Sequence, residues 1–172
     1  MTNVSYRLGQ PEVYRVLDEL GIPFEYHEHL PTPTVDDARK YWTDTETTYC
    51  KNLFFRNHKG NRHYLVIMES SQDLNIHDLE KRLKQGKISF ASDQRMQKYL
   101  GLQAGSVSPF GLINDTEHHV HVFFDNALQH AKKISFHPND NRVSLILPAA
   151  GFWRYMDATK NGYDFVDLRK NI

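Results

Sequence analysis

The feature that most constrains the fold is a pair of apolar segments joined by a short turn. Residues 49–57 and 62–69 are rich in aromatic and aliphatic side chains, and Gly60 in the connection between them can adopt a positive φ. This pattern predicts a β-hairpin. Its second strand is nearly all apolar, so we expect it to be central in a sheet. Both faces of the first strand are apolar too, because Leu53 and Phe55 point one way and Phe54 the other.

A lysine interrupts the first strand of this hairpin. It lies in the segment Cys50-Lys51-Asn52-Leu53-Phe54, near the start of the predicted strand. Lysine is rarely buried without a partner. Two interpretations therefore stay open: Lys51 extends to solvent from the strand end, or it is held over a pocket.

The remaining periodicity predicts four or five helices and about seven strands. The expected helices span residues 11–20, 34–42, 75–86, 92–101 and 148–156. The expected strands, besides the hairpin, span residues 24–28, 120–125, 133–137, 142–147 and 163–168, with a short one at 88–90, and residues 102–111 are expected to be a loop. Strands and helices do not alternate regularly. The pattern therefore favours a single α+β domain over residues 1–172, with a mixed sheet instead of a doubly wound fold.

Composition excludes several classes of protein. A single cysteine cannot form an intramolecular disulfide, so we expect a reducing, cytoplasmic compartment. No apolar run approaches the roughly 20 residues of a membrane span, and residues 1–6 carry no targeting pattern. The net charge is zero, which argues against DNA and other partners bound by generic phosphate neutralisation. Residues 51–100 nevertheless hold 10 basic and 5 acidic side chains, so a polyanion would dock there, unless these cations only form the solvated face of a helix.

Common catalytic motifs are absent. There is no His-Glu-x-x-His pair, no Cys-x-x-Cys, no Gly-x-Ser-x-Gly elbow and no phosphate-binding glycine fingerprint. The ten histidines still suggest one metal alternative. His118, His119 and His121 lie along an expected strand edge, with His119 and His121 on one face. A metal-dependent hydrolase using this cluster is therefore kept as an alternative, although no metal or cofactor is expected.

Three segments together resemble a known family. They are Cys50-Lys51-Asn52-Leu53-Phe54, the Gly-x-x-x-Pro loop Gly105-Ser106-Val107-Ser108-Pro109, and Phe136-His137-Pro138-Asn139. In this order, with Thr34-Val35-Asp36-Asp37-Ala38 upstream, they resemble the YbaK/ProX family of trans-acting prolyl-tRNA editing proteins over nearly the whole chain. The Lys-Asn-Leu-Phe and Gly-Ser-Val-Ser-Pro-Phe-Gly forms are more similar to the ProX branch, which clears Ala-tRNA(Pro), than to the YbaK branch, which clears Cys-tRNA(Pro). One departure is that His137 is followed by Pro138-Asn139-Asp140, where an apolar residue often sits after the proline.

The resemblance implies a partly closed mixed sheet flanked by helices, and hydrolysis of an aminoacyl-tRNA ester without metal or cofactor. It implies Lys51, Gly105 and His137 as catalytic residues. Implied substrate-binding residues are Thr34, Asn52, Ser106, Val107, Ser108, Pro109 and Asn139. The expected partner is the acceptor end of mischarged tRNA(Pro), with prolyl-tRNA synthetase as a second candidate partner and no membrane.

Selection of alanine against the larger proline requires a small pocket that excludes by size. Candidate wall residues are Thr34 and Val35 at a helix start and Ile67 or Leu65 on the adjacent strand. Two further functions stay open at this point. One is Cys-tRNA(Pro) deacylation by the same family chemistry, and the other is a non-catalytic tRNA- or synthetase-binding module in which Lys51 only contacts phosphate.

Overall fold

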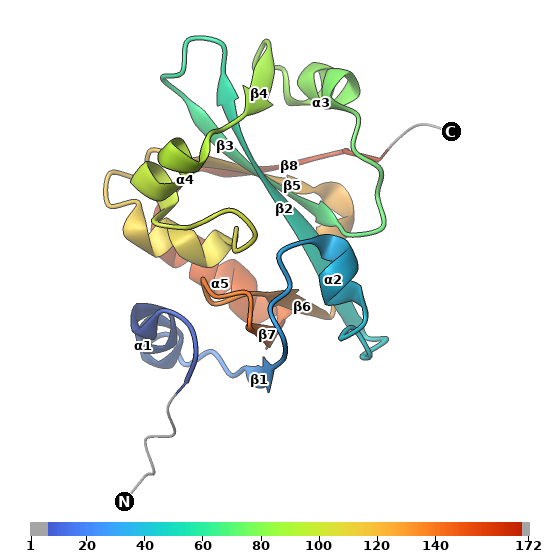
Figure 1. The fold of residues 1–172 in the computed structure, drawn as a ribbon, viewed down its shortest axis with the longest axis vertical. Coiled ribbons are helices and arrows are strands. Elements are labelled where there is room, and N and C mark those ends of the chain that lie inside the picture. The colour runs from blue at the N-terminus through green and yellow to red at the C-terminus, as the bar shows by residue number, and fades with distance from the viewer. Residues whose placement is uncertain (1–6, 170–172) are drawn as a thin grey trace, which may run out of the picture.

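The computed structural model describes residues 7–169, in which helices surround one eight-stranded mixed sheet (Figure 1). Strand order is β1-β7-β6-β2-β3-β5-β8, and β4 pairs with β2 beside this path. The α-helices are α1 (Pro11–Glu19), α2 (Val35–Arg39), α3 (Ile76–Leu83), α4 (Asp93–Leu100) and α5 (Ala149–Thr159). The strands are β1 (Glu25–Glu28), β2 (Thr47–Asn57), β3 (His63–Glu69), β4 (Ile88–Phe90), β5 (His121–Asp125), β6 (Lys133–Phe136), β7 (Val143–Pro148) and β8 (Tyr163–Val166). Two 3₁₀ helices, η1 (Pro109–Asn114) and η2 (Asn126–His130), complete the set.

Strand β2 is shared by the two parts of the sheet. Its first residues, 47–49, pair in parallel with β6, and its last residues, 55–57, pair with β4 along the same edge. Its other edge pairs with β3 over residues 50–56. Within the described residues, positions 50–53 therefore have a strand neighbour on only one side. The predicted mixed α+β sheet is confirmed, and β2 is where its two parts separate.

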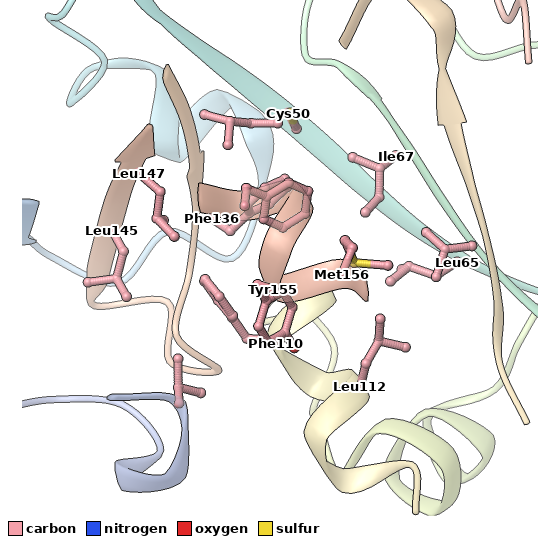
Figure 2. Close-up of a cluster of buried hydrophobic side chains, with 14 of the residues drawn as sticks. Cys50, Leu65, Ile67, Phe110, Leu112, Phe136, Leu145, Leu147, Tyr155 and Met156 are labelled. Atoms are coloured by element: carbon pink, nitrogen blue, oxygen red, sulfur yellow. The ribbon is translucent and has the colours of Figure 1, made fainter. Parts of the chain in front are cut away.

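The predicted hairpin is confirmed. β2 and β3 pair antiparallel, and Gly60 in the turn has a φ of 72°. Phe54 lies in the larger core with Leu65 and Ile67, whose centre is shown in Figure 2. Phe55 lies in a second core on the other face of the sheet. Burial of each such side chain contributes roughly 1.5–3 kcal/mol, so the hairpin stabilises both cores at once.

Predicted helix starts are confirmed by their caps. The side chains of Thr34, Asn75 and Ser92 each accept a hydrogen bond from a backbone amide three residues on. The second predicted helix is shorter than expected, because α2 ends at Arg39 and the chain continues in tight turns through Trp42. The last three residues of the predicted loop 102–111 form the start of η1, which Ser108 caps by accepting from the Phe110 amide.

The eight strands agree with the expected count of about seven. One expectation about strands needs correction, because β2 begins at Thr47, two residues earlier than predicted. Lys51 therefore lies in the interior of the strand and not at its start. The extension comes from pairing with β6, which is more than 80 residues away in the sequence, and such long-range pairing leaves no local pattern. The expectation for residues 1–6 lies outside the described part of the chain, as do residues 170–172.

A histidine pair, buried His63 and partly buried His119, joins β3 to the segment before β5. His63 Nδ1 lies 2.9 Å from His119 Nε2, and Arg95 Nη1 lies 3.1 Å from His63 Nε2. Tyr99 stacks on His119 with ring centroids 4.4 Å apart. Burial, together with the neighbouring His119 and Arg95, lowers the pKa of His63 from 6.5 to about 4.

This pKa shift predicts acid sensitivity. Between pH 6.5 and 4 the unfolded chain binds more protons at His63 than the folded chain, so the free energy of unfolding should fall by roughly 2–3 kcal/mol as pH decreases through that window. His63→Phe should flatten this part of the urea-unfolding profile. His77→Phe, at a histidine whose side chain is 93% exposed, is the control and should leave the profile unchanged. An unchanged slope in His63→Phe would contradict the assignment.

Candidate active site

A cavity of about 250 Å³ lies where β2 has no neighbour on one edge. Its remaining walls come from the segment around α2, the loop at Gly105, and strands β6 and β7. Because the cavity opens at a strand edge, side chains from both faces of β2 reach it. Lining residues are Thr32, Pro33, Thr34, Val35, Ala38, Trp42, Cys50, Lys51, Asn52, Leu53, Gly105, Val107, Ser135, Phe136, His137 and Ser144.

Lys51 places a positive charge in this cavity. It pairs across the hairpin with Met68, so its main chain is fixed by the β2–β3 ladder. Burial lowers the pKa of Lys51, with Asp73 acting in the opposite direction and Arg39 in the same direction. Within residues 7–169 no carboxylate forms an ion pair with it. The ammonium group is therefore free to interact with a bound ligand.

Asn52 adds unsatisfied polar groups beside the lysine. Its side-chain oxygen Oδ1 is buried without a hydrogen-bond partner in the described part of the chain. Backbone groups also alternate between the two edges of a strand. The Phe54 carbonyl accepts from the Ala91 amide on the β4 side, so the amides and carbonyls of Cys50 and Asn52 face the same, open edge. A buried polar atom without a partner is costly, and these groups suit a polar ligand.

Gly105 forms the opposite wall and cannot carry a side chain there. Its φ is 85°, a conformation that favours glycine. An added Cβ would lie 3.1 Å from Pro33 Cα and 3.2 Å from Pro33 O. The loop and the Pro33 segment, which both line the cavity, are therefore in close contact. The Ser106 amide donates to the Gln103 carbonyl, which closes the turn that presents Gly105.

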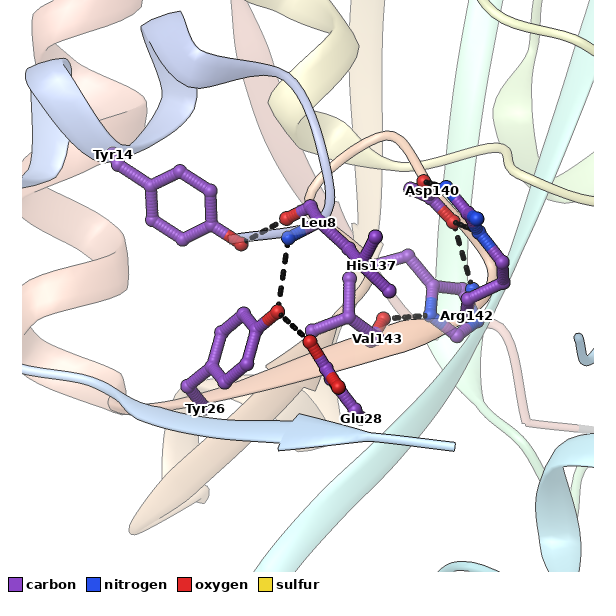
Figure 3. Close-up of polar contacts among 8 residues, drawn as sticks. All are labelled: Leu8, Tyr14, Tyr26, Glu28, His137, Asp140, Arg142 and Val143. Carbon is purple, nitrogen blue, oxygen red and sulfur yellow. Dashed lines mark hydrogen bonds and ion pairs between the residues drawn. The ribbon is translucent and has the colours of Figure 1, made fainter. Parts of the chain in front are cut away.

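His137 directly follows the last residue of β6 and lines the cavity. Its Nδ1 hydrogen-bonds to the Val143 carbonyl (Figure 3), at 2.7 Å, and only a protonated nitrogen can donate to a carbonyl. Nε2 therefore carries the lone pair. Its neighbour Thr32 Oγ1, at 3.4 Å, donates its proton to the Asn141 carbonyl, so Nε2 remains an acceptor. Burial lowers the pKa of His137, partly opposed by the Val143 hydrogen bond, and the ring is neutral at pH 7.

The structure thus brings Lys51, Gly105 and His137 together with the predicted binding residues Thr34, Asn52 and Val107 around one cavity. This convergence joins segments that are 103 residues apart at their extremes in the sequence, from Thr34 to His137.

Four predicted binding residues lie outside the cavity lining. Ser106 lies in the turn behind Gly105, and Ser108 is buried as the cap of η1. Pro109 is buried, and its carbonyl accepts a hydrogen bond from the Tyr155 hydroxyl. Asn139 has a φ of 64° and donates from Nδ2 to Gln10 Oε1 at 2.8 Å. Their contacts shape the two loops that carry Gly105 and His137.

The predicted pocket wall is half correct. Thr34 and Val35 line the cavity, but Leu65 and Ile67 do not, because both are fully buried in the main core shown in Figure 2. Sequence reasoning missed Thr32, Ala38, Trp42, Ser135, Ser144 and other lining residues. Ser135 and Ser144 carried a usable signal, since each is a small polar residue in an otherwise apolar strand.

Cys50 lines the cavity but is poorly suited to act as a nucleophile. The thiol is buried, and burial raises its pKa well above the ordinary value, with Glu69 adding to the effect. A thiol with a raised pKa carries little of the reactive thiolate at neutral pH.

The histidine cluster proposed as a metal alternative does not assemble. β5 begins at His121, so His119 lies before the strand and contacts His63, while His121 Nε2 lies 2.7 Å from Asp164 Oδ2. His118 has a φ of 54° in the preceding turn. Across residues 7–169, no three His, Cys, Asp or Glu side chains are placed to share a metal ion.

Comparison with known proteins assigns the segment that contains the cavity to a family. A sequence model of the family described as "Aminoacyl-tRNA editing domain" matches residues 29–155, which include every residue that lines the cavity. The chain belongs to the aminoacyl-tRNA editing domain family. The resemblance inferred from the Lys51, Gly105 and His137 segments is therefore confirmed.

Relatives of the editing domain align over most of this chain. It is 37% identical over 152 residues to "Prolyl-tRNA editing protein ProX" of Acetoanaerobium sticklandii, covering 88% of this chain and 93% of the relative. It is 27% identical over 161 residues to mouse "Prolyl-tRNA synthetase associated domain-containing protein 1", covering 91% and 94%. A crystal structure described as a candidate trans-editing enzyme for prolyl tRNA synthetase superposes with a TM-score of 0.65 at 18% identity, covering 94% of this chain and 99% of that one. This likeness confirms the predicted editing-domain fold.

Proposed function

We propose that this protein is a trans-editing hydrolase that deacylates mischarged tRNA(Pro), with Ala-tRNA(Pro) as its substrate. The observation that carries the proposal is the convergence of Lys51, Asn52, Gly105 and His137 on one small cavity in a chain 37% identical to a prolyl-tRNA editing protein. Residues 1–172 are taken as one editing domain, consistent with the continuous sheet of the described part.

The cavity offers the groups that ester hydrolysis needs. Water attacks the carbonyl carbon of the aminoacyl ester, and the Lys51 ammonium stabilises the negative charge that develops on the carbonyl oxygen. The neutral His137 accepts a hydrogen bond at Nε2 from the attacking water or a ribose hydroxyl and orients it. The bond between the carbonyl carbon and the ribose oxygen then breaks, the water hydroxyl stays on the amino acid, and the water proton passes to the ribose oxygen. No covalent enzyme intermediate is required.

The size of the cavity supports alanine as the amino acid. At about 250 Å³ it is below the roughly 300–1,000 Å³ typical of ligand pockets. Thr34, Val35, Ala38 and the Pro33 loop form walls that can exclude a larger side chain. Exclusion by size is the effective way to separate alanine from cognate proline, since one or two methylene groups give little binding energy.

The purified protein tests the proposal directly. We expect it to release alanine from Ala-tRNA(Pro) much faster than the spontaneous rate, to release cysteine from Cys-tRNA(Pro) more slowly, and to leave Pro-tRNA(Pro) intact. The measurement is loss of labelled amino acid from acid-precipitable tRNA. Faster release of cysteine would assign the alternative specificity, and binding of all three tRNAs without hydrolysis of any would make the protein a non-catalytic module.

The partners and compartment follow from this function. The acceptor end of tRNA(Pro) is the ligand, and prolyl-tRNA synthetase is the proposed source of the mischarged substrate. We place the activity in the cytoplasm, where a lone reduced Cys50 is expected. None of the helices in residues 7–169 has the length and apolar character to cross a membrane.

A further inference from the structure

Gln10, at the start of α1, contacts the loop that carries His137, although it precedes the residues 29–155 that the family model matches. The Gln10 amide donates to the Pro138 carbonyl at 3.0 Å, and Pro138 directly follows His137. A side chain would not fit at the preceding position, because a Cβ on Gly9 would lie 2.7 Å from the same carbonyl. The chain before α1 is therefore packed directly against the His137 loop.

The Gln10 side chain does not cap the helix that it precedes. Gln10 is the N-cap residue of α1, but its side chain makes no cap hydrogen bond. Its Nε2 instead donates to Asn114 Oδ1 at 2.7 Å, and its Oε1 accepts from Asn114 Nδ2 at 3.1 Å and from Asn139 Nδ2 at 2.8 Å. Gln10, Asn114 and Asn139, which we call the amide cluster, thus join the start of α1 to η1 and to the His137 loop.

The orientation of each amide in this cluster is determined by carbonyl groups that can only accept. Asn114 Nδ2 lies 2.8 Å from the Leu100 carbonyl, and Asn139 Nδ2 lies 3.3 Å from the Phe110 carbonyl. Both asparagines therefore present donors, and Gln10 Oε1 is the acceptor between them. A rotated Gln10 amide would place its NH₂ group against two donors, so the cluster has one arrangement.

The amide cluster ties together the two loops that line opposite parts of the cavity. Asn139 lies two residues after His137 and has a φ of 64°, so its side chain leaves the loop in a fixed direction. Its other partner, Phe110, donates its amide to Ser108 Oγ in the loop that begins at Gly105. The His137 loop and the Gly105 loop are therefore held relative to each other through Asn139.

The segment that carries Gln10 is anchored in its own right. The Leu8 amide donates to the Tyr26 hydroxyl at 2.9 Å, and the Tyr14 hydroxyl donates to the Leu8 carbonyl at 2.5 Å (Figure 3). Tyr26 belongs to β1 and Tyr14 to α1. The amide cluster is thus supported by the sheet and by a helix, as a group that positions a loop needs to be.

We propose that Gln10 is a positioning residue, which through Asn139 and Pro138 holds His137 in the orientation that ester hydrolysis requires. The inference rests on the proposed deacylase function. Gln10 does not line the cavity, so its effect passes through the His137 loop. The hydrogen bond from His137 Nδ1 to the Val143 carbonyl depends on where this loop between β6 and β7 lies.

Substitution of Gln10 by methionine tests the proposal, because Gln10→Met keeps the side-chain length and removes its hydrogen bonds. We expect kcat for Ala-tRNA(Pro) to fall roughly ten-fold and KM to change by less than about two-fold, since the cavity still binds the ester while His137 is displaced. Asn139→Gly removes the same hydrogen bond from the other side, at a φ that glycine adopts freely. The double variant should be no slower than either single variant, because the two residues act as one unit.

Gln85→Met is the matched control for Gln10→Met. Gln85 is also partly buried, and its side chain accepts from the Tyr64 hydroxyl and donates to the Leu83 carbonyl, outside the cavity lining. This variant should lower the midpoint of thermal unfolding but keep kcat. Normal kcat in both Gln10→Met and Asn139→Gly, or an equal loss of kcat in Gln85→Met, would overturn the proposal.

The ring nitrogens of His137 report its position without any substrate. Two-bond ¹H–¹⁵N spectra of the neutral ring should show the tautomer protonated at Nδ1 in the wild-type protein, since Nδ1 donates to the Val143 carbonyl. We expect a mixture of tautomers in Gln10→Met and the wild-type signature in Gln85→Met. Unchanged His137 signals in Gln10→Met would overturn the proposal. If these signals change but the wild-type protein hydrolyses no aminoacyl-tRNA, the support of His137 by Gln10 stands and the deacylase function fails.

Discussion

Replacement of Lys51 by alanine is expected to lower kcat/KM for Ala-tRNA(Pro) deacylation by roughly 10²- to 10³-fold, as loss of one oxyanion-stabilising group does in other acyl-transfer sites. The structural reason is that Lys51 supplies a cationic group to the cavity and has no carboxylate ion-pair partner in residues 7–169. Single-turnover deacylation of saturating Ala-tRNA(Pro) measures the chemical step. Near-normal turnover would remove Lys51 from the mechanism.

Charge and pH separate a catalytic lysine from a general tRNA contact. Lys81→Ala removes an exposed cation from α3, outside the cavity, and should leave the rate of the chemical step unchanged. Burial lowers the pKa of Lys51 below the 10.5 of an ordinary lysine. The wild-type deacylation rate should therefore begin to fall at a pH below 10.5, where the ammonium loses its proton. Lys51→Arg should remove this alkaline limb, since the guanidinium stays charged.

Gly105→Ala is expected to reduce kcat/KM roughly 10²-fold, which is the second large effect. The added methyl group meets both the left-handed backbone conformation, at φ 85°, and the Pro33 main chain at 3.1–3.2 Å. Relief of this contact must move the Gly105 loop or the Pro33 segment, and both line the cavity. Displacement of about 1 Å at an active site can cost this much in rate.

A second glycine provides the matched control for this variant. Gly86 has a φ of 76°, and a Cβ there would meet nothing within 4 Å. Gly86→Ala thus carries comparable backbone strain without a contact near the cavity. It should lower the midpoint of thermal unfolding by a similar amount but keep deacylation intact. Equal loss of activity in both variants would mean that strain and not cavity geometry explains Gly105→Ala.

Local features made much of the fold predictable. The hairpin was evident because two apolar strands and the Gly60 turn are adjacent in sequence, and the helix starts were evident because Thr34, Asn75 and Ser92 cap them directly. The start of β2 and the end of α2 could not be predicted in this way. The start of β2 depends on pairing with β6, and the end of α2 leaves Trp42 to stack on Tyr49. Both are therefore decided by contacts between separate segments.

The sequence predicted the residues proposed to act on the ester, but not all the residues that form the walls of the cavity. Lys51, Gly105 and His137 lie in segments that resemble a known family, and all three reach the cavity. Leu65 was a reasonable wall candidate on the adjacent strand, yet that strand lies on the opposite edge of β2 from the opening. Ser108 and Asn139 belong to the same motifs, but their side chains hold loops and do not line the cavity.

The open edge of β2 also bears on how this chain avoids self-association. An unpaired strand edge is a template onto which a second chain can add a strand, and aggregation often begins there. Here the unpaired stretch covers only residues 50–53, is bounded by β6 and β4, and carries a charge at Lys51. Each of these properties disfavours strand addition. The group proposed to act on the ester would thus also keep the protein from pairing with copies of itself.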